Sequence, residues 1–169
     1  MLPDEKPSFL LDTGPLSVLC SFPIKQSPFI NVVSQYAKIL LPNAVMDEIG
    51  EAGKMSRIVP SLLKRDIVFS IEAPPTPAIL DTAYGKILGP GERSVIKCGL
   101  NTALPIVLDD QDAFIIACRF GLHPMGFQDF IVQLVTEYTL PKAVAVEIIR
   151  LSARQFPAVY LVHTLDMLS

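Results

Sequence analysis

The sequence is poor in the residues that bind transition metals or form disulfide frameworks. Its 169 residues include only 2 histidines and 3 cysteines, and Cys20, Cys98 and Cys118 show no C-x-x-C spacing. An odd number of widely spaced cysteines predicts free thiols in a reducing compartment. His123 and His163 are far apart and have no second soft ligand nearby. This argues against a zinc site and against a Cys–His nucleophile.

Long hydrophobic runs and long basic runs are also missing. Half of the residues are hydrophobic, yet no apolar stretch approaches the roughly 18 residues that a membrane span needs. The acidic, proline-bearing N-terminus does not resemble a signal peptide. We therefore expect a cytoplasmic protein with no membrane segment. The net charge of −3, without a basic run, does not by itself indicate a nucleic-acid partner.

Short apolar segments alternate with helical patterns along the chain. Strands are predicted at residues 7–12, 38–42, 66–73 and 105–108, with a weaker fifth at 122–126. Helical patterns lie between them and beyond, at 13–19, 27–37, 44–52, 55–65, 78–88, 92–103, 112–121, 127–138 and 141–156. The alternation predicts an α/β fold with a mostly parallel sheet, as one domain over residues 1–169.

Acidic residues stand where two of these strands end. Asp12 ends the first strand, and Asp109 ends the fourth, followed closely by Asp110 and Asp112. In open α/β sheets, ligands bind outside the carboxyl ends of the strands. If the first and fourth strands are neighbours, all four carboxylates meet at one rim.

Two more acids can reach this rim, Glu48 on the helix after the second strand and Glu92 just after "GPG". Each acid also has a simpler interpretation. The helix dipole favours Glu92 in a first turn by about 0.3–1 kcal/mol, and Glu48 can lie on a solvated face. Asp110 or Asp112 can cap the following helix, and Asp12 can form a turn. However, acids from four separate elements near one predicted edge favour a common site.

Clustered carboxylates repel each other unless a cation lies among them. Carboxylate oxygens without histidine or thiolate suit Mg²⁺ or Mn²⁺, which activate water and neutralise charge on a phosphoryl group. The sequence therefore predicts that these clustered acids face a Mg²⁺ or Mn²⁺ ion.

Four blocks in this order resemble the PIN-domain family, which includes toxins of toxin–antitoxin pairs and RNA-processing nucleases. They are "LLDTGPLSVL", "LPNAVMDEIG", "GPGERSVIKCGL" and "VLDDQDAFIIACRFGL". The similarity covers about residues 8–135 and leaves a C-terminal helical extension of about 136–169. It implies a three-layer α/β/α fold around a mostly parallel sheet of about five strands.

The resemblance also implies a metal-dependent ribonuclease site. Its catalytic acids correspond to Asp12, Glu48, Glu92, Asp109, Asp110 and Asp112. Of these, Asp12, Glu92 and the Asp109/Asp110 site are expected to hold the metal ion, and Glu48 and Asp112 to complete its shell. Two points stay open at this stage. Either Asp109 or Asp110 is the main metal ligand, and Glu92 stands where the toxins usually carry aspartate.

Further residues are candidates for handling the substrate. Thr13 or Ser94 can orient it, and Arg93, Lys97 or Arg119 can contact phosphate, although each of these cations is also a typical surface charge.

The leading hypothesis is a Mg²⁺- or Mn²⁺-dependent endoribonuclease, the toxin of a toxin–antitoxin pair, with RNA as substrate. Because "AVAVEIIRL" can present an apolar helical face, a homodimer or a small antitoxin-like partner is expected. One alternative is a PIN-like RNA-binding or scaffold protein with weak or no nuclease activity, since the net charge is negative. A receiver-like phosphorylation module is disfavoured, because only Asp12 follows the first strand.

Overall fold

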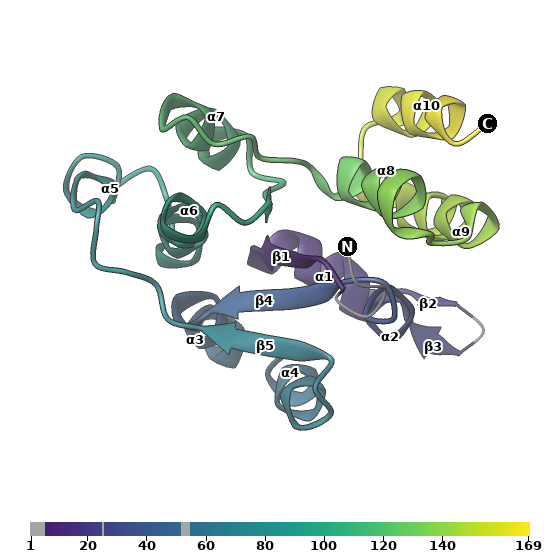
Figure 1. Cartoon of the computed structure of the whole chain (residues 1–169), viewed down its shortest axis with the longest axis horizontal. Coiled ribbons are helices and arrows are strands. Elements are labelled where there is room, and N and C mark those ends of the chain that lie inside the picture. The colour runs from purple at the N-terminus through teal and green to yellow at the C-terminus, as the bar shows by residue number, and fades with distance from the viewer. Residues whose placement is uncertain (1–5, 25, 52–54) are drawn as a thin grey trace.

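The computed structural model describes residues 6–24, 26–51 and 55–169 (Figure 1). The strands are β1 (Ser8–Leu11), β2 (Pro23–Ile24), β3 (Ser27–Pro28), β4 (Lys38–Pro42), β5 (Val68–Ile71) and β6 (Ile106–Val107). The helices are α1 (Thr13–Ser21), α2 (Phe29–Val33), α3 (Asn43–Glu51), α4 (Met55–Lys64), α5 (Ile79–Thr82), α6 (Pro90–Thr102), α7 (Gln111–Arg119), α8 (Phe127–Tyr138), α9 (Lys142–Ser152), the 3-10 turn η1 (Ala153–Gln155) and α10 (Ala158–Met167).

Four strands form a parallel sheet in the order β5-β4-β1-β6, flanked by helices, which confirms the predicted α/β fold. Figure 1 shows β1, β4 and β5 side by side. The register pairs Phe9 of β1 with Ile39 of β4, and Leu11 of β1 with Val107 of β6. The first and fourth predicted strands are therefore neighbours. Their carboxyl ends, with the acids that follow them, meet at one edge of the sheet.

The predicted fifth strand over residues 122–126 is reduced to one bridging residue. Met125 pairs with Val107 in parallel, donating its N–H to the Ile106 carbonyl at 3.0 Å and accepting from the Leu108 N–H at 2.9 Å. The ladder is not extended further, because helix α8 begins two residues later at Phe127. The hairpin of β2 and β3 was not predicted, because strands of two residues leave no hydrophobic period to read.

Two predicted helices are shorter than expected. The pattern at 27–37 yields only α2, and that at 78–88 yields only α5, which ends at Thr82. Near Gly85 the chain turns so tightly that a Cβ there would lie 2.3 Å from the Asp81 carbonyl oxygen. Gly85 has no Cβ and so permits this turn, at which the helical pattern is interrupted.

The C-terminal helices pack onto the sheet through aromatic residues of the core. The Phe9 ring of β1 meets the Phe130 ring of α8 edge-on, with centroids 4.9 Å apart, and both side chains are fully buried. On α9, Ala145, Ile148 and Ile149 are also fully buried. The apolar face that "AVAVEIIRL" was expected to offer to a partner is thus largely occupied inside the molecule.

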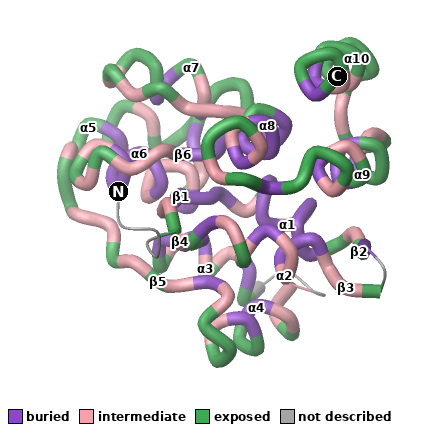
Figure 2. Tube along the Cα trace, turned by 45° about the vertical axis from the view of Figure 1, so that its right-hand side comes forward, coloured by how far each residue is buried: buried purple, intermediate pink, exposed green. Residues whose placement is uncertain are grey.

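Helix α10 is different, because much of its length is exposed (Figure 2). It contacts α8 and α9, and the Thr164 hydroxyl donates to Gln128 Oε1 of α8 at 2.7 Å. Within residues 6–24, 26–51 and 55–169, no helix combines the length and apolar character needed to cross a bilayer.

Candidate functional site

Asp12 follows β1 directly and occupies the N-cap position of α1. Its backbone N–H donates to the Val107 carbonyl at 3.3 Å, which fixes it at the junction of β1 and β6. The residue is only 7% exposed. Its Oδ1 is buried and finds no hydrogen-bond partner among the residues that the structure describes. Such an orphaned acceptor in a native interior calls for a ligand.

The pKa of Asp12 is raised from 3.8 to about 7. Burial is the largest cause, a hydrogen bond from the Thr13 backbone opposes it, and the negative charges of Glu92, Glu48 and Asp109 raise the pKa further. These three acids come from separate parts of the chain. The structure therefore places these three acids near enough for their charges to act on Asp12.

Glu48 connects three helices through its carboxylate. Thr13 Oγ1 of α1 donates to Glu48 Oε2 at 3.0 Å, and the Gly91 N–H of α6 donates to Glu48 Oε1 at 2.7 Å. A Cβ on Gly91 would lie 2.5 Å from Glu48 Oε2, so a larger residue does not fit there without a shift. The second glycine of "GPG", Gly91, thus allows α6 to approach the carboxylate closely. Thr13, expected to orient a substrate, is engaged with Glu48.

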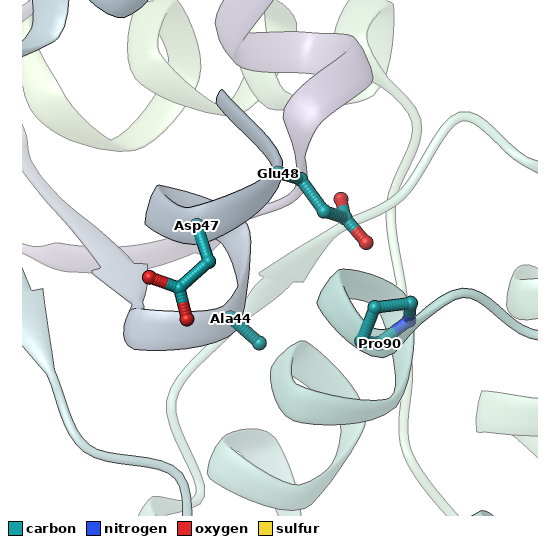
Figure 3. Close-up of a pocket in the computed structure, with 4 residues that line it drawn as sticks. All are labelled: Ala44, Asp47, Glu48 and Pro90. Atoms are coloured by element: carbon teal, nitrogen blue, oxygen red, sulfur yellow. The ribbon is translucent and has the colours of Figure 1, made fainter. Parts of the chain in front are cut away.

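Figure 3 shows that the Asp47 and Glu48 side chains of α3 diverge, with Glu48 extending toward Pro90 and Asp47 pointing elsewhere. A cavity of about 180 Å³ lies at this junction of α3 and α6, lined by Ala44, Asp47, Glu48 and Pro90. Glu48 is therefore reachable from outside even though its oxygens are hydrogen-bonded.

Glu92 lies in the first turn of α6, where its Oε2 accepts from the Gly89 N–H at 2.8 Å. This is the half of a capping box in which the third helical residue reaches back to the cap. Burial raises the pKa of Glu92, and the charges of Asp110, Glu48 and Asp112 add to the effect. Glu92 is therefore both a first-turn acid that caps α6 and a member of the acidic group.

Asp109 and Asp110, which the sequence left interchangeable, have different partners. Asp110 is the N-cap of α7, where its Oδ1 accepts from the Ala113 N–H at 2.9 Å. Asp109 Oδ1 accepts from the Phe127 N–H, at the start of α8, at 2.8 Å. Although Asp109 reaches the surface, the protein atoms around its carboxylate raise its pKa, and the charge of Asp129 adds to this. Asp112 is exposed in the first turn of α7.

Asp129 is an acid of this region that was not predicted from the sequence. A Cβ placed on Gly126 would lie 3.7 Å from Asp109 Oδ1 and 3.8 Å from Asp129 Oδ2, so the two carboxylates flank the same point. Asp129 lies in the first turn of α8, which begins two residues after the bridging residue Met125. An acid in the first turn of a helix that follows a strand is also the pattern that identified Asp112.

Two of the three basic residues named as candidates for phosphate contact form ion pairs within the protein. Arg93 Nε and Lys97 Nζ lie 3.1 and 2.5 Å from the two carboxylate oxygens of Asp81, and Lys97 is buried. Arg119 lies in the last turn of α7, roughly 10 Å along the helix from Asp112 in its first turn. The side chains of Arg93 and Lys97 are therefore ion-paired with Asp81 and hold α5 against α6. Their contact with phosphate stays a prediction.

The chemistry of the donors suits a hard divalent cation, since all are carboxylate oxygens and Asp12 Oδ1 is an unpartnered buried acceptor. The arrangement is open, however. Across the described parts of the chain, no three His, Cys, Asp or Glu side chains could hold a metal ion together as they stand. Glu48, Glu92, Asp109 and Asp110 instead accept hydrogen bonds from the chain itself. Coordination by three of these acids would require side chains to turn.

A protein-family model described as a PIN domain matches residues 9–160. The chain belongs to the PIN-domain family. This membership indicates a nuclease-like fold, as the resemblance implied. The matched region runs past residue 135 through α8, α9 and the start of α10. The match thus includes α9, and the extra C-terminal helices expected after residue 135 are present. No curated protein matches the chain.

Proposed function

We propose that this PIN-domain protein is a Mg²⁺- or Mn²⁺-dependent endoribonuclease that hydrolyses phosphodiester bonds of RNA. We further propose that it acts as the toxin of a toxin–antitoxin pair. The observation that carries the proposal is Asp12, a buried carboxylate with an orphaned oxygen, whose pKa is raised first by burial and further by the charges of Glu92, Glu48 and Asp109. A buried carboxylate that neighbouring acids repel is costly to ionise without a cation, and residues with perturbed pKa values cluster at functional sites.

In this proposal Asp12, Glu92 and Asp109 hold the ion. When bound, the ion would activate water and neutralise developing charge on the phosphoryl group. Asp110, the other candidate ligand, is assigned to capping α7, because its Oδ1 accepts from the Ala113 N–H. Asp112, exposed on the first turn of α7, completes the acidic rim.

Glu48 has a positioning role in the proposed reaction. Its bonds from Thr13 Oγ1 and the Gly91 N–H set the start of α6 relative to α1, and so set where Glu92 stands relative to Asp12. Asp12 itself can hold or release a proton near neutral pH, because its pKa is about 7. In this proposal these residues form an electrostatically negative site that suits a cation.

A PIN-like RNA-binding or scaffold protein without nuclease activity is the second candidate. It is favoured by the open arrangement of the acids and by the pairing of Arg93 and Lys97 with Asp81. The two candidates differ in whether RNA is cut in the presence of Mn²⁺.

The exposed part of α10 supports the proposal of a protein partner, either a second copy or a small antitoxin-like chain. Val159, Tyr160, Val162 and Met167 are between 53% and 70% exposed. Large apolar side chains grouped on one helix in this way are typical of interaction surfaces. A cytoplasmic location is also part of the proposal, supported by three free thiols.

The experiment is cleavage of a fluorescently labelled single-stranded RNA pool with Mn²⁺, and with EDTA as a blank. We expect Asp12→Asn and Asp109→Asn to lower the rate on the order of 100-fold or more, since even residues that only support metal ligands cost 10–100-fold. Asp110→Asn should retain far more activity than Asp109→Asn, because an amide oxygen still caps a helix.

Glu147→Gln, an exposed change on α9, is the matched control and should leave the rate unchanged. Equal activity in Asp12→Asn and the unmodified protein would assign the cleavage to a contaminant and reject the proposal. RNA binding without any cleavage would favour the second candidate.

A further inference from the structure

Helix α10 carries large apolar side chains on its outward face. Val159, Tyr160, Val162 and Met167 are between 53% and 70% exposed. Figure 2 shows α10 at one side of the molecule, with most of its length exposed. The opposite face of the helix, which includes the buried Thr164, packs on α8 and α9. The outward face is thus left uncovered by the described part of the chain.

Exposed charges of opposite sign lie at the two ends of this apolar face. Arg154 is exposed in the 3-10 turn η1, which leads into α10. Asp166 is exposed in the last turn of α10. It shares a helix face with Val159 and Val162, because the three residues recur at i, i+3 and i+7. The segment is therefore basic before the start of α10 and acidic at its end.

The charge of Asp166 is poorly placed in a single copy of the chain. A helix dipole disfavours a negative charge in the last turn, and the last turn of α10 contains no basic residue to offset it. At the other end of the helix, the N-cap residue is Pro157, and no side chain caps the helix there. The first N–H groups of α10 consequently favour a negative charge. An antiparallel neighbour would bring these two complementary ends together.

We propose that two copies of this chain form a dimer by pairing their α10 helices antiparallel about a two-fold axis. The inference rests on the protein partner proposed above and does not depend on ribonuclease activity. With the axis near residues 160–161, Val159 of each copy lies opposite Val162 of the other. Asp166 then lies beside the uncapped start of the other α10 and beside the Arg154 that precedes it. The two-fold symmetry forms each of these contacts twice.

The distribution of charge favours a second copy in this orientation over other occupants. A parallel pair would place like charges together, Asp166 beside Asp166 and Arg154 beside Arg154, which is repulsive. A helix that lies on a membrane keeps its charges on its polar face, whereas Asp166 shares the face of Val159 and Val162.

The length of α10 sets the expected strength of the dimer. Its 10 residues span about 15 Å. The paired surface is therefore at the low end of the size range for specific protein interfaces. We expect a dissociation constant in the micromolar range.

The test is sedimentation velocity of the intact protein between about 1 µM and about 1 mM. The unmodified protein should change from monomer to dimer within this range. Val162→Glu should weaken self-association at least about tenfold, because it places two carboxylates at the apolar centre of the interface. Ile115→Glu is the matched control and should not change self-association, since Ile115 is a large apolar residue, 42% exposed, on α7 instead. Circular dichroism and thermal melting verify that each variant is folded.

Two charge reversals test the antiparallel orientation. Arg154→Asp and Asp166→Arg should each weaken homodimer formation about tenfold, because each variant brings like charges together at both ends of the interface. A mixture of the two variants contains opposite charges at both ends of a heterodimer. The mixture should therefore associate nearly as tightly as the unmodified protein.

A protein that stays monomeric up to about 1 mM would overturn the inference. If that monomer bound phosphatidylcholine vesicles and Val162→Glu did not, α10 would be assigned to a lipid surface instead. A dimer unaffected by Val162→Glu would place the interface elsewhere, and a mixture that associates no better than its components would reject the antiparallel pairing. RNA cleavage by a protein that never dimerises would reject only the dimer, and a dimer that never cuts RNA would reject only the ribonuclease proposal.

Discussion

Replacing Asp12 by asparagine tests the electrostatic state of the proposed site independently of catalysis. The native protein holds a proton on Asp12 more tightly than the unfolded chain does, because its pKa is raised from 3.8 to about 7. As pH rises from about 4 to about 7, the unfolded chain loses this proton first. The free energy of unfolding should therefore fall across this window, with the full penalty present above about pH 7.

The size of the effect follows from the pKa difference. A change from 3.8 to about 7 corresponds to about 4 kcal/mol, because each pKa unit is equivalent to about 1.4 kcal/mol. An asparagine side chain carries no charge and has a shape nearly identical to that of aspartate. Without metal, we expect Asp12→Asn to be more stable than the unmodified protein at pH 8.5, by up to about 4 kcal/mol. The difference should disappear near pH 4.

The assay is urea denaturation followed by circular dichroism, in EDTA, at several pH values between 4 and 9. Adding Mn²⁺ at pH 8.5 should stabilise the unmodified protein and not Asp12→Asn, since a ligand that binds only the native state raises its stability. Glu147→Gln serves as the control for loss of a charge from an exposed helix position. A variant that is less stable at pH 8.5, or a difference that does not vary with pH, would refute the reasoning.

Two further changes test the hydrogen bonds that position the acids. Gly91→Ala should destabilise the protein by about 1–3 kcal/mol in thermal melts, because its Cβ would lie 2.5 Å from Glu48 Oε2. Gly50→Ala is the control, because Gly50 lies on the same helix as Glu48 and has open space around it; this variant should be neutral or more stable by up to about 1 kcal/mol. Equal losses of stability in the two variants would contradict the close approach of Gly91 to Glu48. Asp110→Ala should cost about 0.5–2 kcal/mol through loss of the α7 cap, whereas Asp110→Asn should cost much less; equally large costs would argue that the negative charge matters more than the cap.

The parallel sheet and the meeting of Asp12 with Asp109 were predictable from the sequence. Apolar runs that stop at an acid mark buried strands and their carboxyl ends, and the alternation with helices makes the strands parallel. Strand neighbours, however, were only an assumption until the order β5-β4-β1-β6 placed β1 next to β6.

The finer features of the site depend on contacts that no local pattern encodes. Whether Asp109 or Asp110 caps α7 is decided by where the chain turns after β6, and both residues fit either position by type. The bonds from Thr13 and Gly91 to Glu48 join residues 35 and 43 positions apart. The pairing of Arg93 and Lys97 with Asp81 likewise depends on how α5 packs against α6.

The most direct test of the proposed site is the number of protons released when the protein binds Mn²⁺. Calorimetric titrations in buffers of different ionisation enthalpy give this number. Because Asp12 has a pKa of about 7, we predict that Mn²⁺ binding releases about one proton at pH 6 and close to none at pH 8.5, and that Asp12→Asn binds far more weakly at both. Equally tight Mn²⁺ binding by Asp12→Asn, or proton release that does not change with pH, would contradict the claim that this buried carboxylate holds the ion.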